Sequence, residues 1–164
     1  MPQPTPSTLT GAFESGDAIS PSQTLHVSLY LFIFAFVFSL YDAISTILCM
    51  DALGYDYEAN ILLRWIMHNT GIAGFIGAKL GVTLLVLVSV YYLIANSVHS
   101  GGVGTKKFYG VYLGVIFSNA YAGASNTSVV LRDSSFYLLG LNSMQMVLLL
   151  IFLPPLAVLL FDAR

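Results

Sequence analysis

The sequence predicts an all-α fold, a polytopic membrane four-helix bundle with a short amphipathic surface helix between its first two spans. Two observations carry this prediction. The chain is 57% hydrophobic and only 9% charged, whereas about a quarter of the residues of a typical soluble domain are charged. Its apolar residues are also gathered into four runs, each reaching the roughly 20 residues that a helix needs to cross the hydrocarbon core of a bilayer.

Residues 1–24 are predicted to form a disordered polar tail, and residues 25–164 a single four-span transmembrane domain. The tail is rich in Pro, Ser and Thr and contains no Lys or Arg, so it lacks the basic start of a signal peptide. We therefore expect the first apolar run to be retained as a membrane anchor.

The predicted spans cover residues 25–53, 71–96, 108–130 and 136–161. The segments HSGGVGTKK and LRDSS separate the last three of them, and both contain residues typical of turns. Pro154 and Pro155 should bend the fourth span, and neighbouring helices can satisfy the carbonyl groups that the two prolines leave without a donor.

Between the first two spans, residues 56–69 have the pattern of a helix that lies along the membrane surface. Polar residues recur there at every fourth position, which places them on one face of a helix: Asp56, Asn60, Arg64 and His68. Asp56 is expected to cap the start of this helix. Trp65, on the other face, is expected to anchor the helix at the interface.

Polar residues also occur inside the spans, in the half of the membrane nearest the first loop. At a rise of 1.5 Å per residue, Asp42 should lie about 16 Å and Lys79 about 12 Å below that loop. Because polar groups that face lipid are costly, we expect the two side chains to meet as an ion pair or a water-bridged pair. Glu58 is expected to be a second acceptor. The predicted intramembrane polar site comprises Asp42, Thr46, Glu58, Asn60, Lys79, Asn119, Asn126, Asn142 and Gln145.

This polar site favours binding or transport of a small solute or ion. A structural or assembly subunit of a membrane complex is an alternative. An intramembrane acid–base enzyme that uses Asp42 or Glu58 is a further alternative, ranked lower because the sequence has no nucleophile–base pair or metal motif. We predict no cofactor, because one cysteine and three scattered histidines form no metal-binding pattern. The net charge of -2 gives no reason to expect nucleic acid.

The expected location is the cell membrane, with several passes and both termini in the cytoplasm. Lys106, Lys107 and Arg164 would lie on the cytoplasmic side, against Arg64 and Arg132 on the other side. The lipid bilayer is then the first partner. A stripe of small residues would also let another helix approach closely, either from within this chain or from a second copy of it: Gly74, Gly77, Ala78 and Gly81.

The polar residues of the first loop and its flanking spans form a recognisable pattern. Asp42 and Thr46 read as D-x-x-x-T, Glu58 and Asn60 follow as E-x-N, and Lys79 lies in the next span. This resembles a family of small four-span bacterial and archaeal membrane proteins catalogued as a domain of unknown function, with the pattern D-x-x-x-T, G, E-x-N-P and K. The chain departs from that pattern at Ile61, where the family has Pro. The resemblance implies the span arrangement and no particular activity.

Overall fold

A computed structural model describes residues 20–58, 60–101, 105–134 and 138–162. Throughout these residues the fold is all-helical, as predicted, apart from one isolated bridge between Leu138 and Leu141. The elements are α1 (Pro21–Leu53), the 3-10 helix η1 (Tyr55–Tyr57), α2 (Ile61–His99), α3 (Lys106–Arg132) and α4 (Ser143–Asp162).

Three of the described helices, α1, α2 and α4, are long and apolar enough to cross a membrane. Together with the composition of the chain, they identify a membrane protein. The remaining long helix, α3, is comparable to α1 in length but interleaves its apolar residues with Ser, Asn and Gly. Its polarity reflects its position, because it lies between other helices.

Two helices begin at residues other than those predicted. Most of the predicted tail lies outside the described residues, but α1 already begins at Pro21, because Ser20 and Gln23 form a capping box. In contrast, α4 begins only at Ser143 instead of residue 136. The preceding residues form a turn in which Leu139 and Gly140 have φ angles of 55° and 76°.

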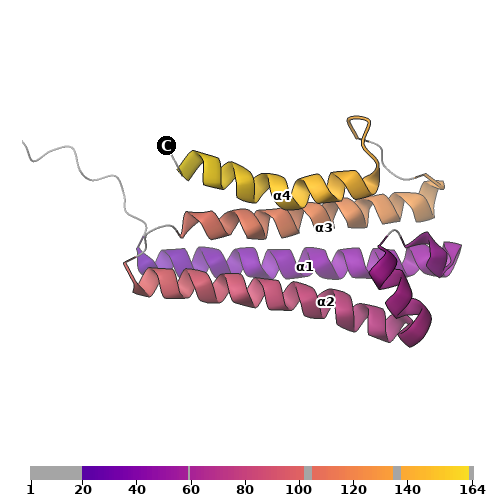
Figure 1. The fold of residues 1–164 in the computed structure, drawn as a ribbon, viewed down its shortest axis with the longest axis horizontal. Helices are drawn as coiled ribbons and strands as arrows, with labels where there is room; N and C mark the ends of the chain where they lie inside the picture. Colours follow the sequence, from indigo (N-terminus) through magenta and orange to yellow (C-terminus); the bar gives the residue numbers. More distant parts are fainter. Residues whose placement is uncertain (1–19, 59, 102–104, 135–137, 163–164) are drawn as a thin grey trace, which may run out of the picture.

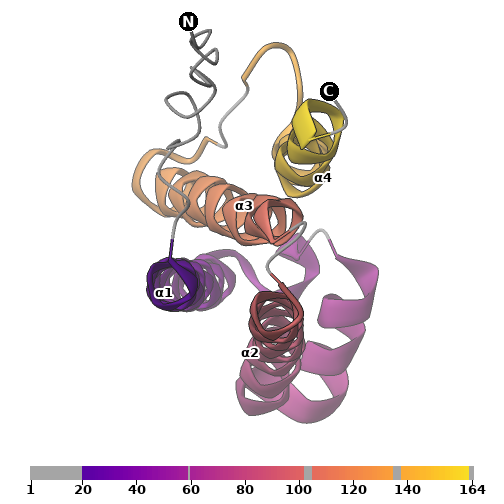
Figure 2. The same cartoon turned by 90° about the vertical axis from the view of Figure 1, so that its left-hand side faces the viewer.

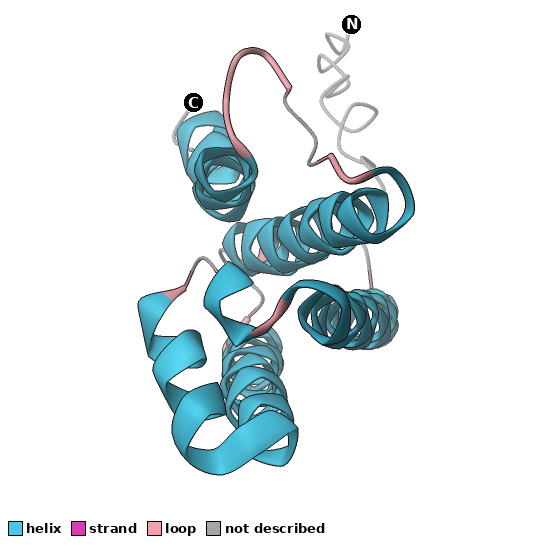
Figure 3. Ribbon diagram, turned by 90° about the vertical axis from the view of Figure 1, so that its right-hand side faces the viewer, coloured by secondary structure: helices cyan, strands magenta, loops and turns pink. Residues whose placement is uncertain are grey.

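A short helix is present where the surface helix was predicted, but its start was predicted wrongly. Asp56 lies in η1, and the α-helix begins at Ile61 with Asn60 as its N-cap. The helix then breaks at Gly71, whose φ of 69° favours glycine. Residues 61–70 therefore form a separate short arm of α2, which crosses the direction of the long helices (Figures 1 and 3). The break falls where the second span was predicted to begin.

The long helices run side by side, with α3 in a central position (Figures 1 and 2). Within the described residues, α1 packs against α2 and α3, while α4 packs against α3 alone. One cluster of buried residues joins α1, α2 and α3 at the end far from the first loop: Ala35, Leu87, Val90, Ile94 and Tyr112. A second cluster, Met50, Met67 and Phe75, fastens the short arm to α1 and to the rest of α2.

Small residues of α3 allow α4 to approach closely. A Cβ atom added at Gly114 would lie 2.6 Å from the carbonyl oxygen of Ile151. That carbonyl is one that Pro155 cannot satisfy, because proline has no N–H group. A Cβ atom at Gly110 would similarly meet the backbone of Pro155 at 2.7 Å. The α3 backbone therefore covers the part of α4 that its two prolines interrupt.

Two glycines in the stripe of small residues on α2 face open space among the described residues. Gly77 and Gly81 are exposed, and a Cβ atom at either position would have no neighbour within 4 Å. Gly74 instead lies against the side chain of Thr70 in the short arm. This part of α2 is consequently an open, smooth surface.

Candidate functional site

Asp42 and Lys79 form an ion pair between α1 and α2, as their matching depths predicted. Lys79 Nζ lies 2.9 Å from Asp42 Oδ2, and the two side chains are only 16% and 7% exposed. The ammonium group also lies over the ring of Phe75, 5.3 Å from its centroid. Phe75 is one turn earlier on α2, so helical spacing places its ring beside the lysine. An unpaired charge at such a depth in a bilayer would cost about 2.5–3.5 kcal/mol on insertion scales.

The hydroxyl group of Thr46 links the two charged residues. It donates a hydrogen bond to the backbone carbonyl of Asp42 over 2.7 Å, and it accepts one from Lys79 Nζ over 3.2 Å. Its second acceptor position is filled by Asn126 Nδ2, at 2.9 Å. A threonine hydroxyl has one hydrogen to donate and two lone pairs, so all of its hydrogen-bonding capacity is used. The D-x-x-x-T spacing is thus explained by one helical turn of α1.

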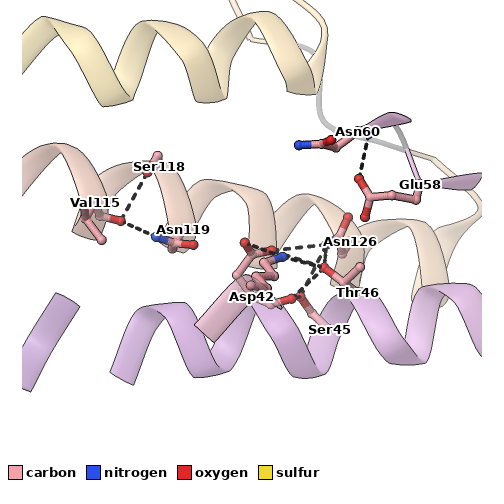
Figure 4. A network of polar contacts seen from close by, with 10 residues as sticks. Asp42, Ser45, Thr46, Glu58, Asn60, Val115, Ser118, Asn119 and Asn126 are labelled. Carbon is pink, nitrogen blue, oxygen red and sulfur yellow. Dashed lines mark hydrogen bonds and ion pairs between the residues drawn. The ribbon is translucent and has the colours of Figure 1, made fainter. Parts of the chain in front are cut away.

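Asn126 brings α3 into the same network. Besides its bond to Thr46, its Nδ2 lies 3.4 Å from Asp42 Oδ1 and 3.5 Å from Ser45 Oγ (Figure 4). Asp42, Ser45 and Thr46 are all buried. Three helices are therefore joined through one group of buried hydrogen bonds and an ion pair, which we call the polar core: Asp42, Ser45, Thr46, Lys79 and Asn126.

Glu58 and Asn60 organise the entry to α2. Asn60 Oδ1 accepts hydrogen bonds from the N–H groups of Leu62 and Leu63, at 3.0 and 3.3 Å. Glu58 Oε1 in turn accepts from the N–H group of Asn60 over 2.8 Å (Figure 4). Among the described contacts Glu58 makes none with Lys79, so the expected second acceptor is not bonded to the ammonium group. In the E-x-N motif, therefore, the Asn side chain caps the helix and the Glu side chain holds the backbone of that Asn.

The side chains of the predicted polar face do come together, although they belong to two elements: Asp56 lies in η1, and Arg64 and His68 lie in α2. Arg64 donates to the backbone carbonyl of Asp56, and His68 Nε2 lies 3.2 Å from Asp56 Oδ1. The rings of His68 and Tyr55 meet edge to face. These exposed contacts hold η1 against the short arm, and so fix the loop that carries Glu58.

Three of the predicted site residues lie elsewhere or have other partners. Asn119 donates to the carbonyl group of Val115, in its own helix, and takes no part in the polar core (Figure 4). Asn142 and Gln145 exchange hydrogen bonds of 2.9 and 3.0 Å as a cap at the start of α4. Both are exposed rather than deep in a span, because α4 begins later than predicted.

All residues of the polar core except Ser45 line a cavity of about 610 Å³. Seven of the nine predicted site residues line it, the exceptions being Asn119 and Gln145. Apolar side chains complete the wall, with Met50 and Leu63 on one side and Met144, Val147, Leu148 and Ile151 of α4 on another. Every helix of the described chain, including η1, contributes at least one residue.

The sequence reasoning missed several contributors to this region. Ser125 of α3 and Ser143 of α4 share a hydrogen bond of 2.7 Å, and both line the cavity. Ser125 could have been found, since it adjoins Asn126 on a helix face rich in small residues. Ser143 gave no signal, because residues near it were placed inside a span.

Comparison with known proteins places the chain in a family. A family model described as a domain of unknown function (DUF5658) matches residues 27–124, more than half of the sequence. The chain therefore belongs to this family, in agreement with the resemblance noted from its motifs. No curated protein matches the chain. No solved structure matches it either.

We predict strong coupling between Asp42 and Lys79. Asp42→Asn alone leaves a buried ammonium group without its counterion, and Lys79→Met alone leaves a buried carboxylate. Each should lower the free energy of unfolding by about 3–5 kcal/mol, and the double variant should recover part of that loss. The measurement is reversible unfolding in mixed micelles, followed by circular dichroism.

Asp51→Asn is the matched control for this cycle, because it removes the same charge from an exposed position at the end of α1. It should change stability by no more than about 0.5 kcal/mol. Strictly additive losses in the double variant would show that the two charges do not stabilise each other.

The departure at Ile61 should be structurally neutral. Position 61 is the first residue of α2, where a helix does not use the N–H group and where Pro is favoured. Its neighbour Asn60 has φ and ψ angles of -82° and 109°, which suit a residue before Pro. Ile61→Pro should therefore leave the thermal unfolding midpoint unchanged or raise it. Ile66→Pro, inside the same short arm, should lower the free energy of unfolding by about 3 kcal/mol or more.

Proposed function

We propose that this protein is a multi-pass protein of the cell membrane with four spans, and that its cavity binds a small solute or ion at the polar core. The observation that carries the proposal is the cavity itself. It brings a buried ion pair, a hydroxyl group and an amide together on the wall of a space large enough for a small molecule. Cavities of roughly 300–1,000 Å³ with a few convergent polar groups are typical of ligand sites.

The proposal of a fourth span rests on the position of α3. At 1.5 Å per residue, its 27 residues extend about 40 Å, enough to cross a bilayer core of about 30 Å. It runs alongside α1 and α4, both apolar enough to span. Its buried serines face its neighbours instead of lipid: Ser118, Ser125 and Ser128. A helix enclosed in this way needs less apolar surface than one exposed to lipid.

We further propose that both termini face the cytoplasm. With four spans, Lys107 lies on the same side as the termini, while Arg64 and Arg132 lie at the opposite ends of their helices. The excess of basic residues on the terminal side is three to two when Lys106 and Arg164 are included, which the positive-inside rule associates with the cytoplasm. Accessibility of a cysteine placed at each loop to a membrane-impermeant reagent tests this orientation.

One observation favours a second candidate, a structural or assembly subunit. Thr46 is fully satisfied within the polar core, and Asp42 and Lys79 already neutralise each other. A closed network of this kind can fix the register of helices without binding anything. Because a neutral, fully bonded core requires no ligand, the two candidates are separated by whether a solute changes the stability of the protein.

We expect solute binding to raise the unfolding temperature of the wild type. A ligand at one hundred times its dissociation constant stabilises a protein by about 2.7 kcal/mol. The purified protein should be melted in nanodiscs with monovalent cations, divalent cations, amino acids and amines in turn. Asn126→Ala, which removes an uncharged group from the cavity wall, should abolish the increase caused by any binding solute.

Ser39→Ala is the matched control for that experiment. Ser39 lies on α1, is fully buried, and its hydroxyl oxygen has no hydrogen-bond partner. The variant should keep the full response to the solute, because the residue does not line the cavity. If no tested solute raises the melting temperature of the wild type by more than it raises that of Asn126→Ala, the structural role is the better account.

We also propose that the open surface of α2 around Gly77 and Gly81 is where a second copy of the chain packs. Its support is that both glycines are exposed and that a Cβ atom added at either would meet no atom of another element within 4 Å. Close helix contacts in lipid favour such residues. Gly77→Leu should then shift the protein from dimer to monomer in sedimentation or crosslinking in lipid. Leu93→Phe, on an exposed position of α2 about three turns beyond Gly81, should leave the dimer intact. An unchanged oligomeric state in Gly77→Leu would exclude this surface.

A further inference from the structure

The charges on the cavity wall do not balance. Asp42, Lys79 and Glu58 are the charged side chains that line it, and the first two neutralise each other in the ion pair. Glu58 accepts one hydrogen bond, from the N–H group of Asn60. The nearby cation Arg64 donates to Asp56 instead, and no described basic residue forms an ion pair with Glu58. The cavity therefore carries one uncompensated negative charge at its loop end.

Most of the opposite wall is apolar. Met144, Val147, Leu148 and Ile151 face the cavity from α4. Their spacing of three and four residues forms a continuous stripe along about two turns of that helix. Leu63 of the short arm lies across the same space. A small hydrated ion would leave this surface unused, whereas an apolar chain would cover it.

The cavity also has walls that do not meet. Residues of both α2 and α4 line it, yet in the described residues no Cα atom of one helix lies within 8 Å of a Cα atom of the other. Both are long and apolar enough to cross a membrane. The space between them therefore opens sideways, toward what would be the lipid tails in the proposed arrangement.

We infer that the cavity takes an amphipathic organic cation, whose ammonium group binds at Glu58 beside the polar core and whose apolar chain lies along α4. This inference rests on the proposed solute-binding function and names its ligand class. The opening between α2 and α4 lets the chain enter from the bilayer without its apolar part passing through water. Glu58 supplies the charge, and Val147, Leu148 and Ile151 supply the surface for the chain.

The test uses octylamine as the probe, with the full chain in phosphatidylcholine nanodiscs and empty discs as the reference. Equilibrium dialysis should show saturable binding of octylamine above the empty-disc level. Octanol and octanoate, with chains of the same length, should bind much more weakly, as should ethylamine, which lacks the chain. Glu58→Gln should weaken octylamine binding about tenfold, the effect of losing one hydrogen bond to a charged group.

Glu58→Gln keeps an oxygen that can accept the hydrogen bond from the N–H group of Asn60, so the start of α2 is preserved. Two further variants make the result specific. Asp51→Asn removes an equal charge from an exposed position outside the cavity wall and should bind octylamine like the wild type. Val147→Trp fills the space beside α4 and should abolish binding while circular dichroism shows the helices intact.

The ammonium group can belong to a free amine or to a membrane lipid. Discs prepared from equal amounts of phosphatidylethanolamine and phosphatidylglycerol distinguish these sources, through mass spectrometry of the lipid that stays with the protein after extraction. Enrichment of phosphatidylethanolamine in the wild type, but not in Glu58→Gln, identifies a lipid. Octylamine binding without lipid enrichment identifies a free amine.

The inference is overturned if octylamine binds no better than octanol, or if Glu58→Gln binds it like the wild type. It is also overturned if Val147→Trp changes the oligomeric state and leaves amine binding unaltered, since a second copy would then occupy the opening. Stabilisation by an inorganic ion or a polar solute that Asn126→Ala abolishes, without any octylamine binding, would refute this ligand class and leave the proposed function standing.

Discussion

A charge inside a bilayer needs a partner at its own depth, and the Asp42–Lys79 ion pair is how this chain meets that need. The pair fixes α1 against α2, because any slip along the helices would separate two buried charges. Thr46 then has a donor and two acceptor positions to fill, and Asn126 fills the last of them. The placement of α3 against α1 follows, so one electrostatic requirement sets the relation of three helices.

α3 is polar and α2 and α4 expose apolar side chains for the same reason, which is that α3 lies between other helices while α2 and α4 lie outside. Serines buried in α3 take the place that larger apolar side chains occupy in a soluble core, and small residues bring its backbone against α4 at Gly110 and Gly114. The apolar residues are instead directed outward, where a bilayer would solvate them. For this reason the helix most central to the fold is the one whose composition least resembles a membrane span.

The three apolar helices and the ion pair could be predicted because both follow from regular features of a helix. Length and composition identify an apolar helix, and a constant rise per residue places Asp42 and Lys79 at one depth.

The predictions of helix starts and of Asn119 were wrong where a local alternative competes with the regular helical pattern. Asp56 and Asn60 are both suitable N-caps, and the choice depends on the loop geometry after Gly54, which has a φ of 90°. Asn119 lies on the same face of α3 as Asn126, yet its side-chain amide donates to a carbonyl group in its own helix. The start of α4 depends on a turn at Leu139 and Gly140, whose left-handed angles cannot be read from an apolar run.

Because α4 packs against α3 alone in the described residues, the cavity wall has two parts that can change separately. One is the apolar wall from α4, and the other is the charged wall of Asp42, Glu58 and Lys79. The match to the family model ends at residue 124, so the matched part contains Asp42, Glu58 and Lys79 but not α4. A substitution in α4 can therefore reshape the apolar wall while leaving the charges and the register of α1 and α2 untouched. The chain is modular in this sense: the shape of the space can change at little risk to the fold, whereas a change to the ion pair puts the packing of three helices at stake.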